Sequence, residues 1–165
     1  MRRPQSSEQA AESTGPFRLR RLVPADLDEV LRIEQAAFAH PWTEELMRRE
    51  LTHAWSTILV AEEPTDEGDR IRGFIIFWLV HDEVHILNVA TDPAHLRRGV
   101  AKALIGEALR LGKRAGAALA TLEVRRTNTP AIKLYERFGF RIVGVRPNYY
   151  ADENEDGFVM LLDLP

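Results

Sequence analysis

Cysteine is absent from the 165 residues of this chain. A disulfide framework and a cysteine nucleophile are therefore both excluded. Long apolar runs are also lacking, and none reaches the roughly 18 residues that a membrane-spanning helix needs, so no membrane association is expected. Met1–Pro16 has two arginines but no apolar segment, which is a poor match to a secretion signal. We therefore expect a cytoplasmic protein.

A strong charge of either sign is also missing. With 22 basic and 25 acidic residues, the net charge of −3 excludes the broad basic surface typical of direct nucleic-acid binding. The five histidines form no metal-ligand pattern, because His81 and His85 fall across a predicted turn and strand rather than on one helical face. No metal is expected. A content of 45% apolar and 28% charged residues is ordinary for a globular domain.

The order of apolar patterns predicts one domain with a mixed sheet. Residues 1–16, rich in Ser, Gln, Glu and Ala, are expected to be a disordered tail, and residues 17–165 the folded domain. Helices are expected from Pro24, after Thr43, over Arg98–Arg114 and from Pro130 to Gly139. Strands are predicted at Phe17–Leu22, Thr57–Ala61, Gly73–Leu79, Val84–Val89, Ala118–Val124, Phe140–Val145 and Phe158–Leu164. The order β-α-α-β-β-β-α-β-α-β-β belongs to the α/β or α+β class, with helices on both faces.

Two connections in this order carry specific expectations. The acidic segment Glu62–Asp69 is expected to be the turn of a hairpin. In the helix predicted at Arg98–Arg114, Gly106 and Gly112 each cost about 1 kcal/mol relative to alanine, so close packing must compensate.

A glycine stands where a predicted strand turns into that helix. In Leu96-Arg97-Arg98-Gly99-Val100-Ala101-Lys102 it allows backbone N–H groups to approach an anion, and the helix N-terminus and two arginines favour phosphate. The spacing matches neither the dinucleotide fingerprint nor the P-loop. Taken alone, the segment is equally well read as a solvated helix start.

Three downstream residues are candidates for chemistry, and each has a plainer interpretation. Glu123 alternates with the apolar Leu122 and Val124, so it faces either a cleft or a polar side of the sheet. Tyr135 lies on an apolar helix stripe, where a tyrosine is usually part of the core. Asn128 precedes Pro130 and is typical of a turn.

Together these segments resemble the GNAT (Gcn5-related) N-acetyltransferase superfamily. The similarity rests on Leu87–Pro93, Arg97–Ala101, Leu122–Arg125 with Asn128, and Ala131–Phe140. His40-Pro41-Trp42 and Arg146–Tyr150 narrow the resemblance to the RimI branch, the ribosomal protein alanine N-acetyltransferases. It covers about residues 17–164 and implies the acyl-CoA N-acyltransferase fold with a splayed central sheet.

The resemblance implies a site for acetyl-CoA and roles for single residues. It assigns the general base to Glu123 and the general acid to Tyr135. It assigns cofactor binding to Val89, Ala90, Thr91, Arg97, Arg98, Gly99, Val100, Ala101, Lys102 and Asn128. The acceptor peptide is expected against Trp42, Tyr149 and Tyr150. Leu96 departs from the family, which usually has Gln or Arg at this position. Affinity for the cofactor is the property that this departure is expected to affect.

The implied reaction is direct transfer of an acetyl group, within a ternary complex, to the N-terminal amine of a ribosomal protein, with alanine as the expected first residue. An α-amine, with a pKa of about 7.7–8.0, needs only modest help from a base. A small-molecule amine or a lysine side chain is the alternative acceptor. A third possible function is that of a non-catalytic module that binds acyl-CoA. The acids Asp152, Glu153, Glu155 and Asp156 either attract a basic peptide or form a plain acidic turn. A monomer or weak dimer is expected.

Overall fold

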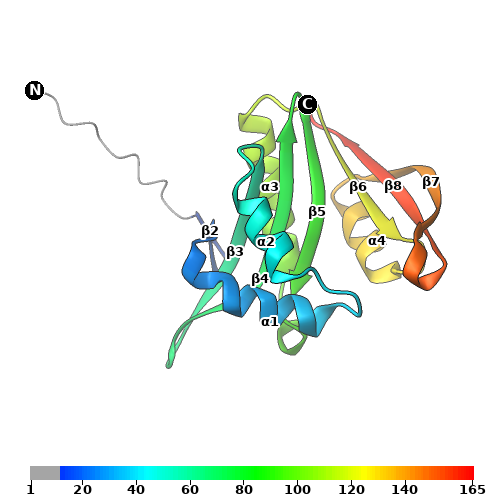
Figure 1. Ribbon diagram of the computed structural model, residues 1–165. Coiled ribbons are helices and arrows are strands. Elements are labelled where there is room, and N and C mark those ends of the chain that lie inside the picture. The colour runs from blue at the N-terminus through cyan, green and yellow to red at the C-terminus, as the bar shows by residue number, and fades with distance from the viewer. Residues whose placement is uncertain (1–11) are drawn as a thin grey trace, which may run out of the picture.

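A single mixed sheet runs through the molecule in the computed structural model, which describes residues 12–165 (Figure 1). Its eight strands have the order β1-β2-β3-β4-β5-β6-β8-β7. The elements are β1 (Glu12–Thr14), β2 (Phe17–Arg21), α1 (Leu27–Ala37), α2 (Glu44–Leu51), β3 (Ser56–Thr65), β4 (Gly68–Val80), β5 (Glu83–Thr91), α3 (Val100–Arg114), β6 (Leu119–Arg125), α4 (Thr129–Arg137), β7 (Arg141–Tyr150) and β8 (Glu155–Asp163). Short 3₁₀ turns lie at Pro24–Asp26, Pro93–His95 and Ala151–Glu153.

The predicted order of helices and strands is confirmed, with one addition at the N-terminal end. Glu12–Thr14 pairs with β2 as the short strand β1, within the segment expected to be a tail. Most of that segment, residues 1–11, lies outside the described residues. No helix in the described part of the chain is long and apolar enough to cross a membrane.

The acidic hairpin is longer than the sequence indicated. β3 and β4 stay paired out to Thr65 and Gly68, so the turn consists of Asp66 and Glu67 rather than all of Glu62–Asp69. Acidic residues remain in the strand because arginines on neighbouring elements neutralise them. Glu63, for example, lies 2.8 Å from Arg72 and 2.6 Å from Arg98.

The third long helix also begins later than predicted, at Val100 rather than Arg98. Arg97 and Gly99 both have left-handed backbones, with φ of 61° and 84°, which an α-helix cannot contain. Gly99 is the N-cap of α3. The glycine at the strand-to-helix junction is thus used for its conformational freedom.

The sheet parts between β5 and β6, which form its only parallel pair of described strands. Pairing covers four positions, from Glu83–Leu119 to Ile86–Leu122, and then stops. At the same level a β-bulge at Leu87 shifts the register of β5 against β4, between Ile76–Asn88 and Phe77–Ile86. The two strands then diverge, and Figure 1 shows β6, β8, β7 and α4 as a separate flank.

Helices cover both faces of the sheet, as predicted, because each contributes an apolar stripe to one of two cores. α3 and α4 cover one face, where Phe77, Leu104, Leu122 and Met160 are buried. α1 and α2 cover the other, where Val30, Ile33, Met47, Phe74 and Ile76 are buried. The diverging strands therefore lie between two buried cores. Thr43 caps α2 through a hydrogen bond from the Leu46 N–H, which confirms the predicted start of that helix.

Candidate active site

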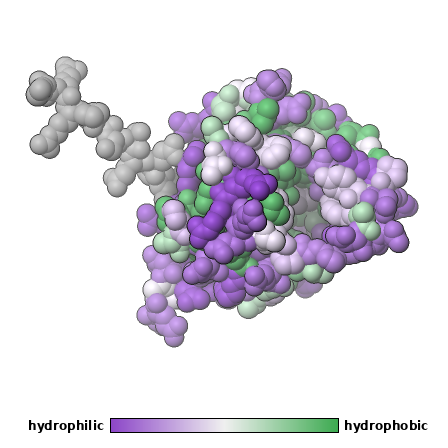
Figure 2. Space-filling view, viewed as in Figure 1, coloured by the Kyte–Doolittle hydropathy of each residue, from purple (hydrophilic) through white to green (hydrophobic). Residues whose placement is uncertain are grey.

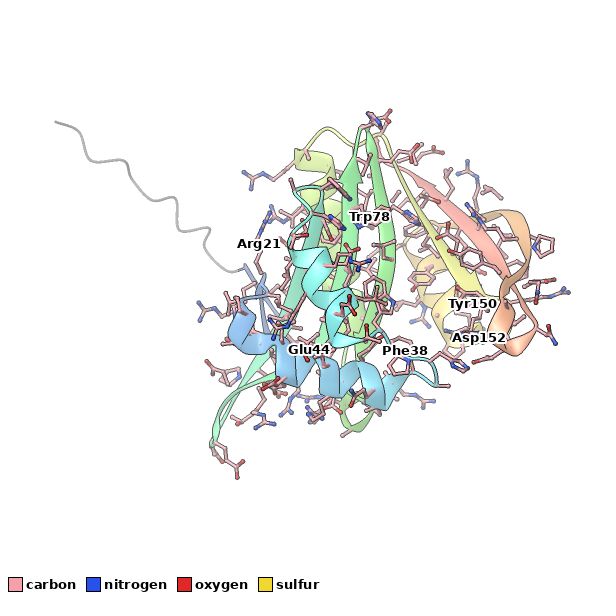
Figure 3. The ribbon with its side chains drawn as sticks, in the orientation of Figure 1. Arg21, Phe38, Glu44, Trp78, Tyr150 and Asp152 are labelled. Carbon is pink, nitrogen blue, oxygen red and sulfur yellow. The ribbon has the colours of Figure 1, made fainter. Side chains whose placement is uncertain are left out.

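A cavity of about 440 Å³ lies where β5 and β6 diverge. Leu87, Asn88 and Val89 line it from β5, and Leu122–Arg125 from β6. The end of α1, the α1–α2 connection, α4 and the β7–β8 connection supply the remaining walls. Figure 2 shows a hollow with apolar residues in an otherwise largely hydrophilic face, and Figure 3 shows Phe38 across from Tyr150 and Asp152. The break in strand pairing thus creates a space between two halves of one sheet.

Glu123 projects from β6 beside this break, with only 10% of its side chain exposed. Its Oε2 lies 2.7 Å from Nε2 of His85 on β5, and its Oε1 lies 3.5 Å from Arg146. The hydrogen bond from His85 is the largest cause that holds the pKa of the Glu123 carboxyl below its ordinary value. Glu123 is therefore an ionised carboxylate at neutral pH and able to accept a proton.

Tyr135 lines the same cavity from α4. Its ring meets Phe140 edge-on with centroids 5.9 Å apart, and burial raises the pKa of its hydroxyl to about 12. The hydroxyl is therefore protonated throughout the neutral range and can donate a hydrogen bond or a proton. The sequence-predicted base and acid candidates thus face one space.

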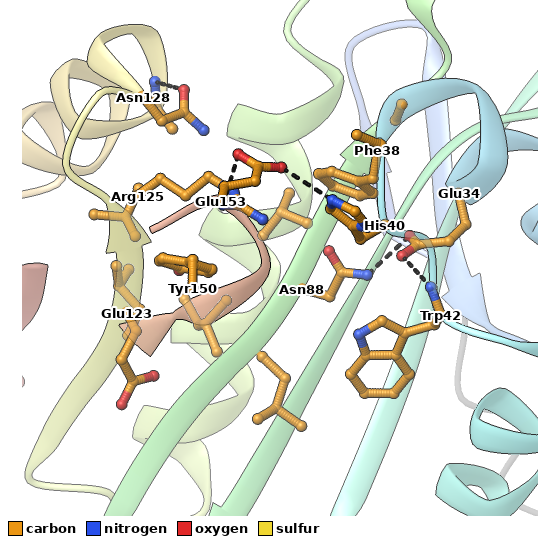
Figure 4. Close-up of a pocket in the computed structure, with 18 of the residues that line it drawn as sticks. Glu34, Phe38, His40, Trp42, Asn88, Glu123, Arg125, Asn128, Tyr150 and Glu153 are labelled. Atoms are coloured by element: carbon orange, nitrogen blue, oxygen red, sulfur yellow. Dashed lines mark hydrogen bonds and ion pairs between the residues drawn. The ribbon is translucent and has the colours of Figure 1, made fainter. Parts of the chain in front are cut away.

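A buried carboxylate that the sequence reasoning did not single out shapes another wall of the cavity. Glu34 on α1 is 1% exposed and accepts hydrogen bonds from the Trp42 backbone N–H at 3.1 Å and from Asn88 Nδ2 at 2.9 Å (Figure 4). Burial raises the pKa of Glu34. These bonds fix Trp42, which lines the cavity as predicted, to the end of α1.

The mouth of the cavity is bridged by charged groups. Glu153 lies 3.5 Å from His40 of the α1–α2 connection and 3.0 Å from Arg125 of β6 (Figure 4). Arg125 also stacks over the ring of Tyr150, 4.1 Å from its centroid. Arg125 thus joins β6 to the β7–β8 connection, a role that was not assigned to it within the segment Leu122–Arg125.

The acids Asp152, Glu153, Glu155 and Asp156 were expected either to attract a basic peptide or to form a plain turn. Three of these four have partners within the protein. Besides the bonds of Glu153, Glu155 accepts hydrogen bonds from Thr127 and lies 3.6 Å from Arg125. Asp156 accepts from the Asn148 N–H at 2.8 Å and lies 3.9 Å from Arg126. Much of the negative charge is therefore compensated within the protein, which favours the turn interpretation.

The junction of β5 and α3 has the backbone expected of an anion site. The first intrahelical bond at this end of α3 runs from the Ala103 N–H to the Gly99 carbonyl, so the N–H groups of Val100, Ala101 and Lys102 precede the hydrogen-bonded turns. The Arg98 guanidinium, however, binds Glu63 through bonds of 2.9 and 2.6 Å. Arg98 and Arg72 together hold the pKa of Glu63 at about 2. Backbone groups are thus better placed for an anion than the Arg98 side chain.

The other predicted residues divide between the cavity and its surroundings. Val89 lines the cavity, whereas Ala90 is buried on the α1 face and Thr91 ends β5. Asn128 also lines the cavity, and its side chain accepts from the Ala131 N–H as the N-cap of α4, so the turn interpretation holds as well. Tyr149 is 47% exposed and packs edge-on against Tyr150 outside the cavity lining.

Two further polar residues of the site were given no catalytic or binding role from the sequence. His85 was considered only as a metal ligand, and Asn88 belonged to the segment Leu87–Pro93 but was given no role of its own. Glu34 offered a signal, because it is a carboxylate on the apolar stripe of its helix. Within residues 12–165 no group of three or more His, Asp or Glu side chains could hold a metal ion.

Comparisons with known proteins give consistent matches. The acetyltransferase (GNAT) family model matches residues 27–140. The [ribosomal protein bS18]-alanine N-acetyltransferase of Escherichia coli strain K12 is 33% identical over 84% of this chain and 92% of its own length. The crystal structure of the Escherichia coli ribosomal-protein-S18-alanine N-acetyltransferase superposes with a TM-score of 0.78 at 33% identity, over 88% of this chain and 92% of that one. Arabidopsis thaliana NAA60 in complex with acetyl-CoA shares the fold, with a TM-score of 0.79 at 21% identity over 90% and 98% of the two chains.

Proposed function

Because this chain belongs to the GNAT family of acetyltransferases, with acetyl-CoA as donor, we propose that it acetylates the N-terminal α-amine of a ribosomal protein that begins with alanine. Residues 17–165 form the catalytic domain in this proposal. The observation that carries it is the pair Glu123 and Tyr135, which line one cavity from β6 and α4, two elements of the flank that borders the β5–β6 break.

The residues at the end of β5 and the start of α3 fit the donor. The left-handed Gly99 and the first amides of α3 form a seat for a pyrophosphate, and nothing lies within 4 Å of the position of a Cβ on Gly99. We assign donor binding to the backbone of Val89–Thr91, to Arg97–Lys102 and to Asn128. The diverging strands leave room for an extended chain between Val89 and Val124. Leu96 is 59% exposed and supplies no polar group, so backbone N–H groups carry the phosphate contacts.

Acetyl-CoA supplies the acetyl group as an activated thioester. Glu123 takes the proton that the attacking amine loses as the new amide bond forms. Tyr135 gives its proton to the departing thiolate. The lowered pKa of Glu123 keeps it ionised but makes it a weak base, which suits an α-amine that is about one-tenth neutral at pH 7. A lysine side chain, with a pKa of about 10.4, would need a far stronger base.

The acceptor wall supports a peptide as substrate. Trp42 and Tyr150 line the cavity on opposite sides, and Tyr149 continues the aromatic surface outside it. We assign acceptor binding to these three residues. The proposed acceptor is the kind named for the Escherichia coli relatives, and the proposed location is the cytoplasm.

Acetyl transfer to synthetic peptides, followed by mass spectrometry, tests the proposal. Ala-, Ser- and Met-starting peptides, each with a basic or neutral continuation, are compared with the same peptides carrying a blocked α-amine. Modification of free Ala peptides alone is expected. Transfer to blocked peptides would identify lysine as the acceptor, and transfer only to small amines would place the substrate in another class. Binding of acetyl-CoA without any transfer would support the non-catalytic alternative.

A further inference from the structure

His85 has a position that neither the donor site nor the acceptor wall explains. His85 lies near the end of the β5–β6 ladder, where it is paired with Thr121. Nε2 lies 2.7 Å from Glu123 Oε2, while the ring meets the indole of Trp78 edge-on at 5.9 Å. His85 is 28% exposed and Glu123 only 10%. Glu123 is therefore the more buried member of the pair.

The exposed side of His85 opens into a second hollow, distinct from the catalytic cavity. This groove of about 650 Å³ is lined by Trp55, Trp78, Leu79, Val80, His81, Glu83 and His85. Glu123 lines the first cavity and His85 the second, so their hydrogen bond connects the two. Protons of the solvent can reach His85 through the groove without entering the catalytic cavity.

We propose that His85 is a positioning residue for the transfer reaction: it anchors one carboxylate oxygen of Glu123, leaves the other for the amine, and slows transfer when it becomes protonated. This inference rests on the proposed role of Glu123. The neutral imidazole donates its Nε2–H to Glu123 Oε2, so the carboxylate has one orientation. Oε1, whose nearest cation is Arg146 at 3.5 Å, remains able to take the proton from the amine.

The pH dependence follows from the charge that His85 gains in acid. An imidazolium beside Glu123 makes the carboxylate a weaker proton acceptor and repels the acceptor's ammonium group. Charged or titratable groups face the pair from β5 itself and from three other parts of the fold, and Tyr149 and Tyr150 at the end of β7 interact electrostatically with Glu123. Arg146 approaches Glu123 from β7, Glu83 and His81 line the groove beside His85, and Glu50 of α2 accepts from Trp78 Nε1 at 2.9 Å. Only His85 hydrogen-bonds Glu123 among the side chains of residues 15–165 described here.

The decisive comparison is between His85→Gln and His85→Leu, measured as kcat and KM from pH 5.5 to 9 with an Ala-starting peptide. Leucine removes the hydrogen bond, and kcat should fall by about 10²-fold, the scale of a misplaced catalytic group, with an unchanged KM for acetyl-CoA. Glutamine keeps a neutral N–H donor. It should restore most of kcat at pH 8 and should lose less activity between pH 8 and pH 6 than the wild type does.

His81→Asn is the matched control, because His81 lines the same groove and asparagine tolerates its left-handed backbone, with φ of 55°. It should keep the wild-type profile. Wild-type kcat in His85→Leu, equal losses in the Gln and Leu variants, or a wild-type acid limb in His85→Gln would each overturn the proposal.

Glu123→Gln separates this inference from the function on which it rests. If that variant keeps full activity, the assignment of Glu123 as base is wrong. If Glu123→Gln is inactive and the His85 variants behave like the wild type, only the role of His85 is wrong. His85→Leu should add no further loss of kcat in the Glu123→Gln background, because the two side chains act as one unit.

Discussion

One methyl group, added at three glycines of α3 or its cap, should have three different effects. At Gly99 the backbone φ of 84° is left-handed, and nothing lies within 4 Å of an added Cβ. Gly99→Ala therefore costs only backbone strain, about 1–2 kcal/mol of unfolding free energy. Relief of that strain would turn the first amides of α3, so KM for acetyl-CoA should rise about tenfold, the effect of one lost charge-assisted hydrogen bond.

The same change within the helix should act in opposite directions. At Gly106 the nearest atom to an added Cβ is Phe138 Cε1 at 3.9 Å, an ordinary contact. Gly106→Ala should gain about 0.5–1 kcal/mol from helix propensity and leave KM unchanged. At Gly112 the added carbon would lie 2.3 Å from Val84 Cγ2. Overpacking there costs about 1–3 kcal/mol and exceeds the helix gain.

Urea unfolding followed by circular dichroism gives the three free energies, and steady-state kinetics gives KM for acetyl-CoA. The reasoning is refuted if Gly99→Ala is as stable as the wild type, or if Gly106→Ala is the least stable of the three. Gly99→Asn is a useful fourth variant. Asparagine enters the left-handed region more easily, so its loss of stability should be smaller than that of alanine.

Three further changes test other parts of the structure. Tyr135→Phe should lower kcat by about 10²-fold with little change in KM for acetyl-CoA. Because the pKa of the Tyr135 hydroxyl is about 12, the pH–rate profile of the wild type should show no loss of activity from ionisation of Tyr135 up to pH 10. Glu63→Gln should remove the stability that the ion pairs of Glu63 with Arg98 and Arg72 supply. Because the pKa of Glu63 is lowered to about 2, this stability is present above pH 4.5 and is lost as the pH falls toward 2. Urea unfolding should therefore show the variant to be less stable than the wild type by about 1 kcal/mol at pH 7, after solvent screening, and equally stable at pH 2. Thr43→Ala should lower the free energy of unfolding by about 1 kcal/mol in the same assay, because the Leu46 N–H loses its hydrogen-bond acceptor. An unchanged free energy would mean that the Thr43 cap does not stabilise α2.

Much of the fold could be predicted because local rules and tertiary structure agree in it. The stripe of α1, the Thr43 cap and the glycine before α3 each specify their element without distant partners. The error in the length of the acidic hairpin occurs where long-range pairing decides. Glu63 remains in a strand because Arg72 and Arg98 lie beside it, and both are distant from a local turn signal.

The candidate site was predictable only in part, for the same reason. Glu123, Tyr135 and Asn128 belong to motifs that a single sequence can show. His85 and Glu34 gain their roles from partners 38 and 54 residues away, namely Glu123 and Asn88. No periodicity in the sequence contains that information, although a carboxylate on the apolar stripe of α1 indicates that some polar partner is required.

The short ladder between β5 and β6 makes the sheet mechanically uneven. Four residue pairs join these strands, whereas eight join β4 to β5 and seven join β6 to β8. The flank formed by β6, β7, β8 and α4 is therefore joined to the rest of the sheet by this short ladder and by the buried core that it shares with α3. A molecule bound between β5 and β6 would contact both halves of the sheet at the level where the strands no longer contact each other, and would thus add a connection that the ladder lacks.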